Sequence, residues 1–407
     1  MWRRLLLVGG LATAIAVAIA VLPGHRGWFD IGVYHGAVAH WVAGGELYEW
    51  VTWNQYGFTY PPFAAVAMLP MAALPWHATI AVNLALTVLA AGFLLLLLVG
   101  PLVRRVGRPR WYAFALAGCL LAALNPVRDT VSFGQVNLLL MALVYLDLWL
   151  LERGRRGAGV GIGLAAAIKL TPAVFVGYLL VTRRWRAAAT AVATAAAATL
   201  FAAAVAPNAT RAYFTEALWD TGRVGRLEYV SNQSLLGLVA RLDPAHPDRL
   251  LWLALVAGAL VVWWVRVRVR RAAGSGDERA GFALTGVLAL LISPITWVHH
   301  LVWLVPGLVV VAAATLPWPP AGPVARRRLR AGIAAYVVLC SGVVWVFANG
   351  FGGPYGFLGG NAYLLVAVGF LALLPVRRGA STMVGPVRPA GRRSSSAARV
   401  RPRVETE

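Results

Sequence analysis

Long apolar segments, separated by short polar ones, follow one another from the start of the chain to about residue 375. An α-helix needs about 20 apolar residues to cross the hydrocarbon core of a bilayer. Several of these segments are shorter, so their helices must extend into the flanking residues. The pattern predicts an all-α, polytopic membrane protein with spans at 5–22, 78–100, 111–124, 136–151, 187–206, 249–265, 280–297, 300–316, 331–348 and 362–375.

Two further apolar segments do not fit a simple span. Residues 61–76 are short and rich in proline, which interrupts helices, and they predict a juxtamembrane or re-entrant helix. Residues 157–182 fit either one helix kinked at Pro172 or a hairpin of two short helices. Arginine runs flank both ends, so a hairpin with Lys169 at its tip keeps both runs on one side. With this hairpin, the pattern predicts about 12 transmembrane helices.

The chain carries a formal net charge of +22, although only 13% of its 407 residues are charged and 60% are hydrophobic. Its arginines lie in short runs between apolar segments, which is the pattern of cytoplasmic loops rather than of a nucleic-acid surface. Placing these runs in the cytoplasm puts both termini there and the polar clusters outside. We therefore predict a multi-pass plasma-membrane protein with an extracytoplasmic active site, a membrane domain at 1–378 and a disordered basic cytoplasmic tail at 379–407.

The first long break in hydrophobicity, at 26–77, is rich in tryptophan and tyrosine, as membrane-interface segments are. It is predicted as the first extracytoplasmic loop, with juxtamembrane helices. It contains Asp30, the first acidic residue of the sequence. Asp30 precedes a segment with apolar residues at helical spacing, and from spacing alone it fits an N-cap and a catalytic base equally well. The two roles are compatible.

A second polar segment, 125–137, lies between two predicted spans. Its Asn-Pro pair and Gly134 predict a turn, with Arg128 as an interfacial charge. Gln135 and Asn137 open a membrane helix, where unpaired amides are costly. A contact to sugar or phosphate is therefore the alternative to a plain turn.

Lys169 is the only lysine of the sequence and lies among apolar residues. It fits either snorkelling to the interface or binding a lipid phosphate. His299 and His300 are adjacent at the junction of two predicted spans, so at most one of them faces a given site on a helix. One of them fits a hydrogen-bond donor beside a phosphate, and the alternative is an ordinary interfacial histidine. Gln233 lies at the start of another apolar helix. It fits a ligand-binding amide, and the alternative is that it only caps this helix.

Motifs for other chemistries are missing from the sequence. The chain has no GxSxG, Walker A or dinucleotide-binding fingerprint, and no HExxH or DxD pattern for a metal. Cys119 and Cys340 lie inside apolar segments, which disfavours a disulfide or a cysteine metal site. We therefore predict no essential metal and no cofactor.

Five blocks of the sequence, taken in order, resemble glycosyltransferase family 87: FDIGVYHGAVAHWVAGGELY, FTYPPFAAVAMLP, NPVRDTVSFGQVNLLL, GLAAAIKLTPAVF and SPITWVHHLVWLVP. Members of that family are actinobacterial α-1,2-mannosyltransferases with the membrane-embedded GT-C fold. The resemblance implies mannosyl transfer from polyprenyl-phosphate mannose to a mannosylated glycolipid, such as a phosphatidylinositol mannoside, lipomannan or lipoarabinomannan. Membrane lipid is the other partner implied, and nucleic acid is not a partner. Protein partners stay unknown from the sequence.

The family has its essential aspartate in the first extracytoplasmic loop, where Asp30 is the matching residue. Inverting transfer needs one base, and phosphate is already a good leaving group, so a second carboxylic acid is not required. The departing phosphate instead needs positive charge or hydrogen-bond donors. Candidates for binding it are Lys169, Arg128, His299 and His300. Candidates for binding sugar or acceptor are Tyr34, Tyr60, Asn125, Gln135, Asn137, Gln233 and Trp297.

Two other functions stay open from the sequence. The enzyme could transfer another polyprenol-linked sugar, or the chain could be a lipid-linked sugar flippase or transporter without catalysis. Transporters carry charged or broken helices at the bilayer midplane and often inverted repeats. The polar residues here collect on one predicted face instead, which favours an enzyme.

Overall fold

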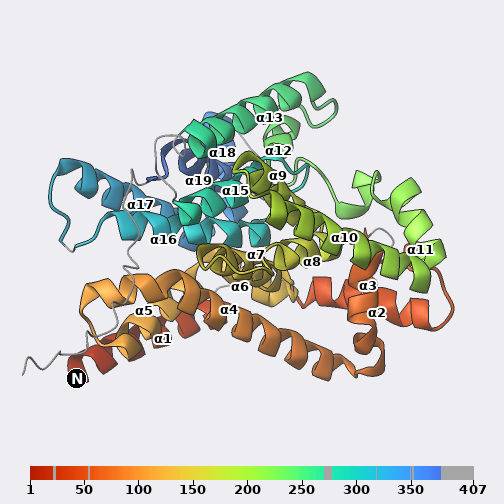
Figure 1. Ribbon diagram of the computed structural model, residues 1–407, viewed down its shortest axis with the longest axis horizontal. Helices are drawn as coiled ribbons and strands as arrows, with labels where there is room; N and C mark the ends of the chain where they lie inside the picture. The colour runs from red at the N-terminus through yellow and green to blue at the C-terminus, as the bar shows by residue number, and fades with distance from the viewer. Residues whose placement is uncertain are drawn as a thin grey trace, which may run out of the picture.

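The computed structural model is built almost entirely of helices (Figure 1). It describes residues 1–21, 24–53, 56–269, 277–317, 319–348, 350 and 353–376. The α-helices are α1 (Trp2–Val21), α2 (Phe29–Val42), α3 (Pro62–Met68), α4 (Trp76–Val106), α5 (Arg110–Ala123), α6 (Asn125–Phe133), α7 (Asn137–Glu152), α8 (Val160–Ile168), α9 (Val174–Val181), α10 (Trp185–Val205), α11 (Pro207–Ala212), α12 (Leu235–Leu242), α13 (Arg249–Trp264), α15 (Glu278–Ile292), α16 (Val305–Ala314), α17 (Pro323–Ser341), α18 (Gly353–Gly360) and α19 (Ala362–Leu373).

Shorter helical turns connect these elements. The 3₁₀ segments are Leu69–Ala73, Thr171–Ala173, Thr221–Val224, Val298–Leu304 and Val343–Phe347, and the π-helical segments are Tyr213–Ala217 and Val265–Val269. Two short strands, β1 (Val51–Thr52) and β2 (Tyr56–Gly57), pair antiparallel in the segment between α2 and α3. Apart from this ribbon, the described residues have the all-α fold that the sequence predicts. The predicted tail at 379–407 lies outside the described residues.

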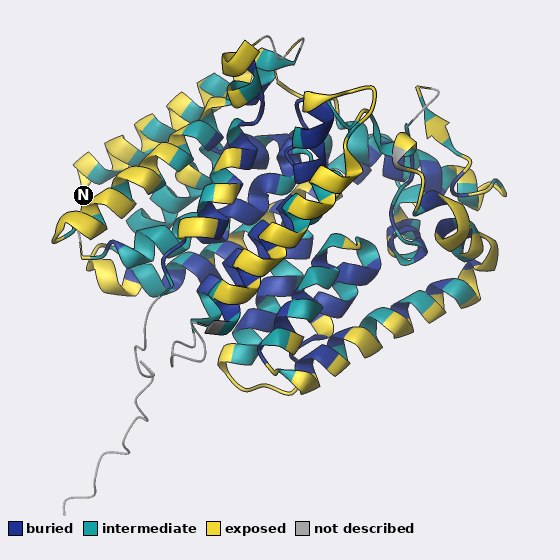
Figure 2. Cartoon of the chain, turned by 90° about the horizontal axis from the view of Figure 1, so that it is seen from above, coloured by how far each residue is buried: buried dark blue, intermediate teal, exposed yellow. Residues whose placement is uncertain are grey.

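Four described helices are long and apolar enough to cross a membrane: α1, α4, α10 and α13 with its continuation to Arg268. Two bent pairs, α5 with α6 and α18 with α19, raise the number to six if each pair is one span. No residue of α1 is buried, and in Figure 2 buried residues fill the centre while outer helices are exposed. Apolar helices whose residues stay exposed suit a lipid surrounding. The chain is thus a multi-pass helical membrane protein, and the count of twelve spans stays a prediction.

The segment after α5 is a helix, which corrects the predicted turn at 125–137. Asn125–Phe133 forms α6, bent by 73° from α5. Pro126 lies at the helix start, where its missing N–H removes no hydrogen bond. Gly134 follows the last turn with φ 73°, a conformation that glycine adopts without strain. Pro126 and Gly134, which predict a turn from the sequence, therefore mark the start and the end of one short helix.

Several predicted spans end earlier than the apolar pattern suggests. α15 ends at Ile292 rather than at 297, because Pro294 follows and cannot continue a helix. The predicted span at 331–348 breaks at Gly342, which has φ 67° and separates α17 from a 3₁₀ segment. Apolarity alone does not reveal these breaks, since the residues on both sides remain apolar.

The segment 157–182 forms two short helices, α8 and α9, joined at Lys169, as in the predicted hairpin. A Cβ atom on Gly159 or Gly163 would lie 2.2 or 2.5 Å from backbone oxygens on successive turns of α10. Such close contact between helix backbones requires small residues, and α10 is rich in alanine. α8 thus runs alongside α10, and α9 returns to the start of α10, so that Lys169 lies at the far tip.

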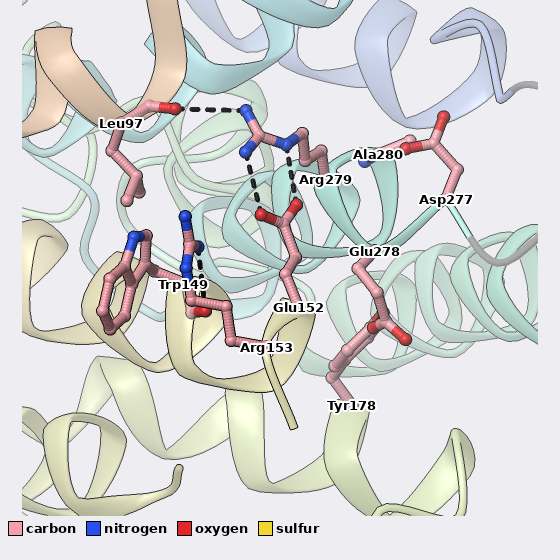
Figure 3. A network of polar contacts seen from close by, with 9 residues as sticks. All are labelled: Leu97, Trp149, Glu152, Arg153, Tyr178, Asp277, Glu278, Arg279 and Ala280. Atoms are coloured by element: carbon pink, nitrogen blue, oxygen red, sulfur yellow. Dashed lines mark hydrogen bonds and ion pairs between the residues drawn. The ribbon is translucent and has the colours of Figure 1, made fainter. Parts of the chain in front are cut away.

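Ion pairs join the helix ends opposite to this tip. Arg279 at the start of α15 donates to both carboxylate oxygens of Glu152 at the end of α7 (2.7 and 2.9 Å) and to the Leu97 carbonyl of α4 (3.1 Å) (Figure 3). Glu278 next to it accepts from the Tyr178 hydroxyl (2.6 Å) and pairs with Arg184. α7 begins at the other end of the bundle, so the candidate site residues and these ion pairs lie at opposite ends.

Candidate active site

Asp30 lies in the first turn of α2 but does not cap it. The N-cap residue is Trp28, in a left-handed conformation (φ 58°), and no side chain caps the helix start. The Oδ2 atom of Asp30 is buried without a hydrogen-bond partner among the described residues. The N-cap interpretation of Asp30 is therefore wrong. A buried carboxylate oxygen left unpaired is costly and typical of functional positions.

Hydroxyl and amide groups connect the neighbourhood of Asp30 with the tip of the hairpin. Tyr34, one turn after Asp30 on α2, has its hydroxyl 2.8 Å from that of Tyr60. Tyr60 precedes α3 and donates to Oε1 of Gln135 (2.9 Å), between α6 and α7. The Gln135 side chain in turn hydrogen-bonds the Asp30 carboxyl group. Four predicted site residues thus form one buried chain of contacts.

Lys169 closes this chain from the other side. Its Nζ atom lies 3.0 Å from the Tyr60 hydroxyl, 3.1 Å from Oδ1 of Asn137 and 3.1 Å from Nε2 of His300. Asn137 is the first residue of α7, and His300 is in the 3₁₀ segment before α16. We call this set the Lys169 network; it comprises Asp30, Tyr34, Tyr60, Gln135, Asn137, Lys169 and His300.

The hydrogen bonds of His300 define the charge of Lys169. Nδ1 of His300 accepts from the Trp297 backbone N–H at 3.2 Å, so the ring is neutral and its proton is on Nε2. Nε2–H then needs an acceptor, and its neighbour is Nζ of Lys169. A neutral amine has two N–H donors and one lone pair, which match Tyr60, Asn137 and His300 respectively. In this arrangement Lys169 is a neutral amine.

Burial has opposite effects on the pKa values of the two ends of the network, both of which lie outside the candidate membrane spans. Desolvation raises the pKa of Asp30 from 3.8 to about 6, while the Gln135 hydrogen bond, and the charge of Lys169 when that amine is protonated, act against this rise. Desolvation lowers the pKa of Lys169, and the Asp30 charge opposes that change. Taking a charge out of water favours the neutral form of each group. A carboxyl group and an amine whose pKa values are shifted toward neutrality suit proton transfer at physiological pH.

A second polar group lies beside the Lys169 network. The Asn125 side-chain oxygen accepts from the Trp345 indole N–H (3.2 Å) and the Tyr363 hydroxyl (3.0 Å). Asp129, on the same helix α6, forms an ion pair with Arg26 at 3.6 Å. We call this set the Asp129 cluster; it comprises Arg26, Asn125, Asp129, Trp345 and Tyr363. Asn125 thus belongs to the Asp129 cluster and not to the Lys169 network.

Two predicted phosphate-binding residues lie outside the Lys169 network. Arg128 donates to the Cys340 carbonyl at 2.8 Å, and its Nε atom is buried without a partner among the described residues. His299 is 3% exposed, and neither of its ring nitrogens has a hydrogen-bond partner within the described part of the chain. Its ring makes edge contacts with Phe133 and His300, at 4.9 and 4.6 Å between centroids. These unpaired atoms fit a place where a polar ligand completes the bonding.

Gln233 and Trp297 occupy different surroundings. Gln233 is fully buried, and its amide bonds the carbonyls of Val230 (2.6 Å) and Gly360 (2.7 Å) and the N–H of Leu364 (2.9 Å). With donors and acceptor engaged by backbone, Gln233 holds α12 against α19. Trp297 is half-buried, and its ring centroid lies 6.4 Å from that of Tyr229. Its backbone, rather than its side chain, reaches the Lys169 network through His300.

Among the described residues, no three His, Cys, Asp or Glu side chains come together in a way that could hold a metal ion. The acid of the Lys169 network, Asp30, has amide, hydroxyl and amine neighbours instead. Independence of metal and cofactor stays a prediction.

Arg26 bears on Asp30, although no local pattern in the sequence indicates it. The Arg26 guanidinium lies 3.9 Å from the Trp345 ring centroid and pairs with Asp129. Two residues further on, the N–H of Trp28 donates to the Ser132 carbonyl at 3.0 Å. The segment leading into α2 is thereby attached to α6. Asp30 lies only two residues after Trp28. Arg26, by attaching this segment to α6, is therefore in a position to orient Asp30.

Replacing Arg26 by glutamine should lower kcat about ten- to hundredfold, since small displacements of a catalytic group have effects of this size. KM for the donor should change little, and Arg26→Lys should restore part of the rate. The matched control is Arg153→Gln, because Arg153 lies 4.1 Å from the Trp149 ring at the opposite end of the bundle. Steady-state kinetics of the three variants test this, and equal loss in Arg26→Gln and Arg153→Gln would contradict it.

A buried carboxylate and an amine, joined by amides and hydroxyls, lie at one end of a bundle of apolar helices, which is the arrangement expected of a membrane-embedded group-transfer enzyme. The sequence profile of glycosyltransferase family 87 matches residues 58–294, more than half of the chain. The chain belongs to glycosyltransferase family 87. This confirms the resemblance found in the five sequence blocks.

Curated relatives support the same assignment. The chain is 33% identical over 336 residues to a polyprenol-phosphate-mannose-dependent α-(1-2)-phosphatidylinositol mannoside mannosyltransferase of Mycobacterium tuberculosis, covering 76% of each sequence. A protein of the same name from Mycolicibacterium smegmatis is 36% identical over 305 residues, 70% of this chain and 69% of that protein. A corresponding pentamannoside mannosyltransferase of M. tuberculosis is 32% identical over 341 residues, 80% of this chain and 74% of that protein. No solved structure matches the chain significantly.

Proposed function

We propose that this glycosyltransferase moves a mannosyl unit from polyprenyl-phosphate mannose to a phosphatidylinositol mannoside and forms an α-1,2 linkage. The names of the relatives supply the substrates. The observation that carries the proposal is the Lys169 network, in which one buried carboxylate and one buried amine are connected through Gln135 and Tyr60. Such a pair provides the two functions that transfer from a sugar phosphate requires.

Asp30 is the base in this proposal. The acceptor hydroxyl attacks the anomeric carbon of mannose, and its proton passes to the Asp30 carboxylate as the new C–O bond forms. At pH 7 a carboxyl group with a pKa of about 6 is mainly ionised, so it can accept this proton. The mannosyl configuration inverts, because the attack comes from the face opposite the leaving phosphate.

Lys169 and His300 serve the leaving group. As the bond between the anomeric carbon and the phosphate oxygen breaks, negative charge grows on the polyprenyl phosphate. His300 can donate from Nε2, and a phosphate beside Lys169 favours the protonated amine, which binds it as a point charge. Tyr34, Asn137 and His299 are assigned to the sugar in this proposal, because their contacts place them around Tyr60 and Lys169. No second carboxylic acid takes part, since phosphate leaves without protonation by an acid.

The reaction takes place on the extracytoplasmic face in this proposal. The Lys169 network lies at the bundle end opposite the Glu152–Arg279 ion pairs, and arginine runs flank that other end. By the charge rule for membrane loops, the arginine-rich end is cytoplasmic. A lipid-linked donor suits an outer face, where nucleotide sugars are absent. The overall architecture would then be of the GT-C type.

The test is transfer of radiolabelled mannose from polyprenyl-phosphate mannose by the purified full-length protein in liposomes, with acceptors that differ in mannose number. We expect one or two phosphatidylinositol mannosides to be labelled, and an α-1,2-specific mannosidase to release the label. Transfer from a different lipid-linked sugar would refute the donor assignment. Movement of the donor between leaflets without any transfer would refute the enzymatic proposal in favour of a flippase.

A further inference from the structure

An apolar cavity of about 380 Å³ lies between α4, α5, α7, α16 and α17. Its lining is aliphatic apart from Met141 and Tyr336. The Tyr336 hydroxyl donates to the Leu120 carbonyl at 3.0 Å and so adds no free polar group to the cavity. A cavity with this lining selects a hydrocarbon chain, because any polar group entering it would lose its hydrogen bonds.

The cavity has a defined direction relative to the site. At one end it is lined by Leu124, which precedes Asn125, and by Leu138, which follows Asn137 of the Lys169 network. At the other end it is lined by Leu102 and Leu329, which lie beside the arginine runs of α4 and α17. The cavity therefore extends from the candidate site toward the basic end of the bundle.

A phosphate-binding candidate also marks the head of the cavity. Arg128 of α6 donates to the carbonyl of Cys340, one helical turn beyond Tyr336 on α17. Lys169 is reached from the same end through Asn137. A guanidinium and an amine that a bound phosphate would protonate thus lie where an apolar chain entering the cavity would carry its polar head.

We propose that this cavity binds the polyprenyl chain of the lipid-phosphate donor. In such a donor the hydrocarbon is attached directly to the phosphate, so a chain site must begin next to the phosphate-binding groups. In a glycolipid acceptor, by contrast, inositol and sugar units separate the acyl chains from the reacting hydroxyl. The adjacency of cavity and cations therefore favours the donor. The inference rests on the proposed function and assigns its donor lipid a place.

Filling the cavity should affect donors according to their chain. Ala312 of α16 lines the cavity, whereas Ala314 of the same helix does not. Ala312→Phe should raise KM for full-length polyprenyl-phosphate mannose about tenfold or more, as expected for blocking a well-packed apolar site. Transfer from a geranyl-phosphate mannose, whose chain is too short to fill the cavity, should stay within about twofold of wild type. Ala314→Phe is the matched control and should leave both donors unaffected.

Each other outcome overturns the proposal in a recognisable way. Equal loss with both donors would show that the effect of Ala312→Phe does not depend on the donor chain, and would refute the chain site. Loss that disappears when the acceptor is deacylated would assign the cavity to the acceptor's acyl chains. Unchanged kinetics with every donor would leave the cavity to bulk membrane lipid.

A binding measurement separates this inference from the reaction itself. A sugar-free polyprenyl phosphate with a photoreactive group in its chain should crosslink to α4, α16 or α17, and Ala312→Phe should abolish the crosslink. Crosslinking there without mannosyl transfer would uphold the chain site and refute the reaction. Transfer combined with crosslinks elsewhere would uphold the reaction and refute the chain site.

Discussion

An Asp30→Asn variant should still bind the polyprenyl-phosphate donor but transfer mannose about 10²- to 10⁴-fold more slowly, the range for loss of a general base. Asparagine keeps the size of the side chain and can still contact Gln135, so the Lys169 network should persist. What is lost is the ability to take the acceptor proton. Single-turnover transfer together with donor binding measures the two effects separately.

The pH dependence of the wild type should carry the signature of the same residue. Burial raises the pKa of Asp30 to about 6, so the carboxylate takes up a proton as the pH falls through that value. A protonated base cannot accept the acceptor proton, and the rate should therefore decline below about pH 6. In Asp30→Asn the residual rate should show no such acid limb. An acid limb that persists in the variant would mean that another group titrates.

The control for Asp30 is an acid in the same loop. Glu49 is exposed, and Glu49→Gln removes a charge of the same sign with the same change of chemistry. Its transfer rate should stay within about twofold of wild type, as for surface substitutions. The thermal unfolding temperature of Asp30→Asn should be no lower than that of wild type, because the substitution removes a poorly solvated carboxylate. Transfer at the wild-type rate by Asp30→Asn would rule out Asp30 as the base.

The residues of the Lys169 network could be predicted from the sequence because each is a polar side chain in apolar surroundings. Polar groups in a membrane protein need partners, so Lys169, Gln135 and Asn137 were conspicuous without any structure. Which of them touch one another was not predictable, since the contacts join segments more than 100 residues apart, such as Tyr60 and Lys169. Their chemical roles remain predictions.

Three features of the structure could not be predicted from the sequence, each for a physical reason. The sequence predicts a turn in place of α6 because Pro126 and Gly134 are residue types that occur in turns and also at the two ends of helices. Arg26 cannot be recognised from the sequence because its partners, Asp129 and Trp345, come from distant segments and leave no local pattern. Gln233 has the composition of a ligand-binding amide, yet its backbone hydrogen bonds are visible only in three dimensions.

A Lys169→Met variant should lose donor binding as well as transfer, which distinguishes it from Asp30→Asn. Methionine has a similar length but cannot bind phosphate, and removing one charge-stabilising group typically costs about 10²- to 10³-fold in rate. Affinity for sugar-free polyprenyl phosphate should fall together with the rate. The control is Tyr34→Phe, which removes a hydroxyl of the same network that does not touch Lys169. It should keep phosphate binding, and equal loss in both variants would indicate collapse of the network instead.

The charge state of Lys169 can be measured directly because the sequence has no other lysine. An amine-reactive reagent can label only Lys169 and the chain's α-amino group, and mass spectrometry distinguishes the two. Since only the neutral amine reacts and burial lowers the pKa of Lys169, labelling should proceed well below pH 10.5, the ordinary value for lysine. Polyprenyl phosphate should protect Lys169, because a bound phosphate favours the protonated, unreactive amine. Labelling that needs strongly alkaline pH would contradict the neutral amine, and labelling that is insensitive to polyprenyl phosphate would remove Lys169 from the phosphate site.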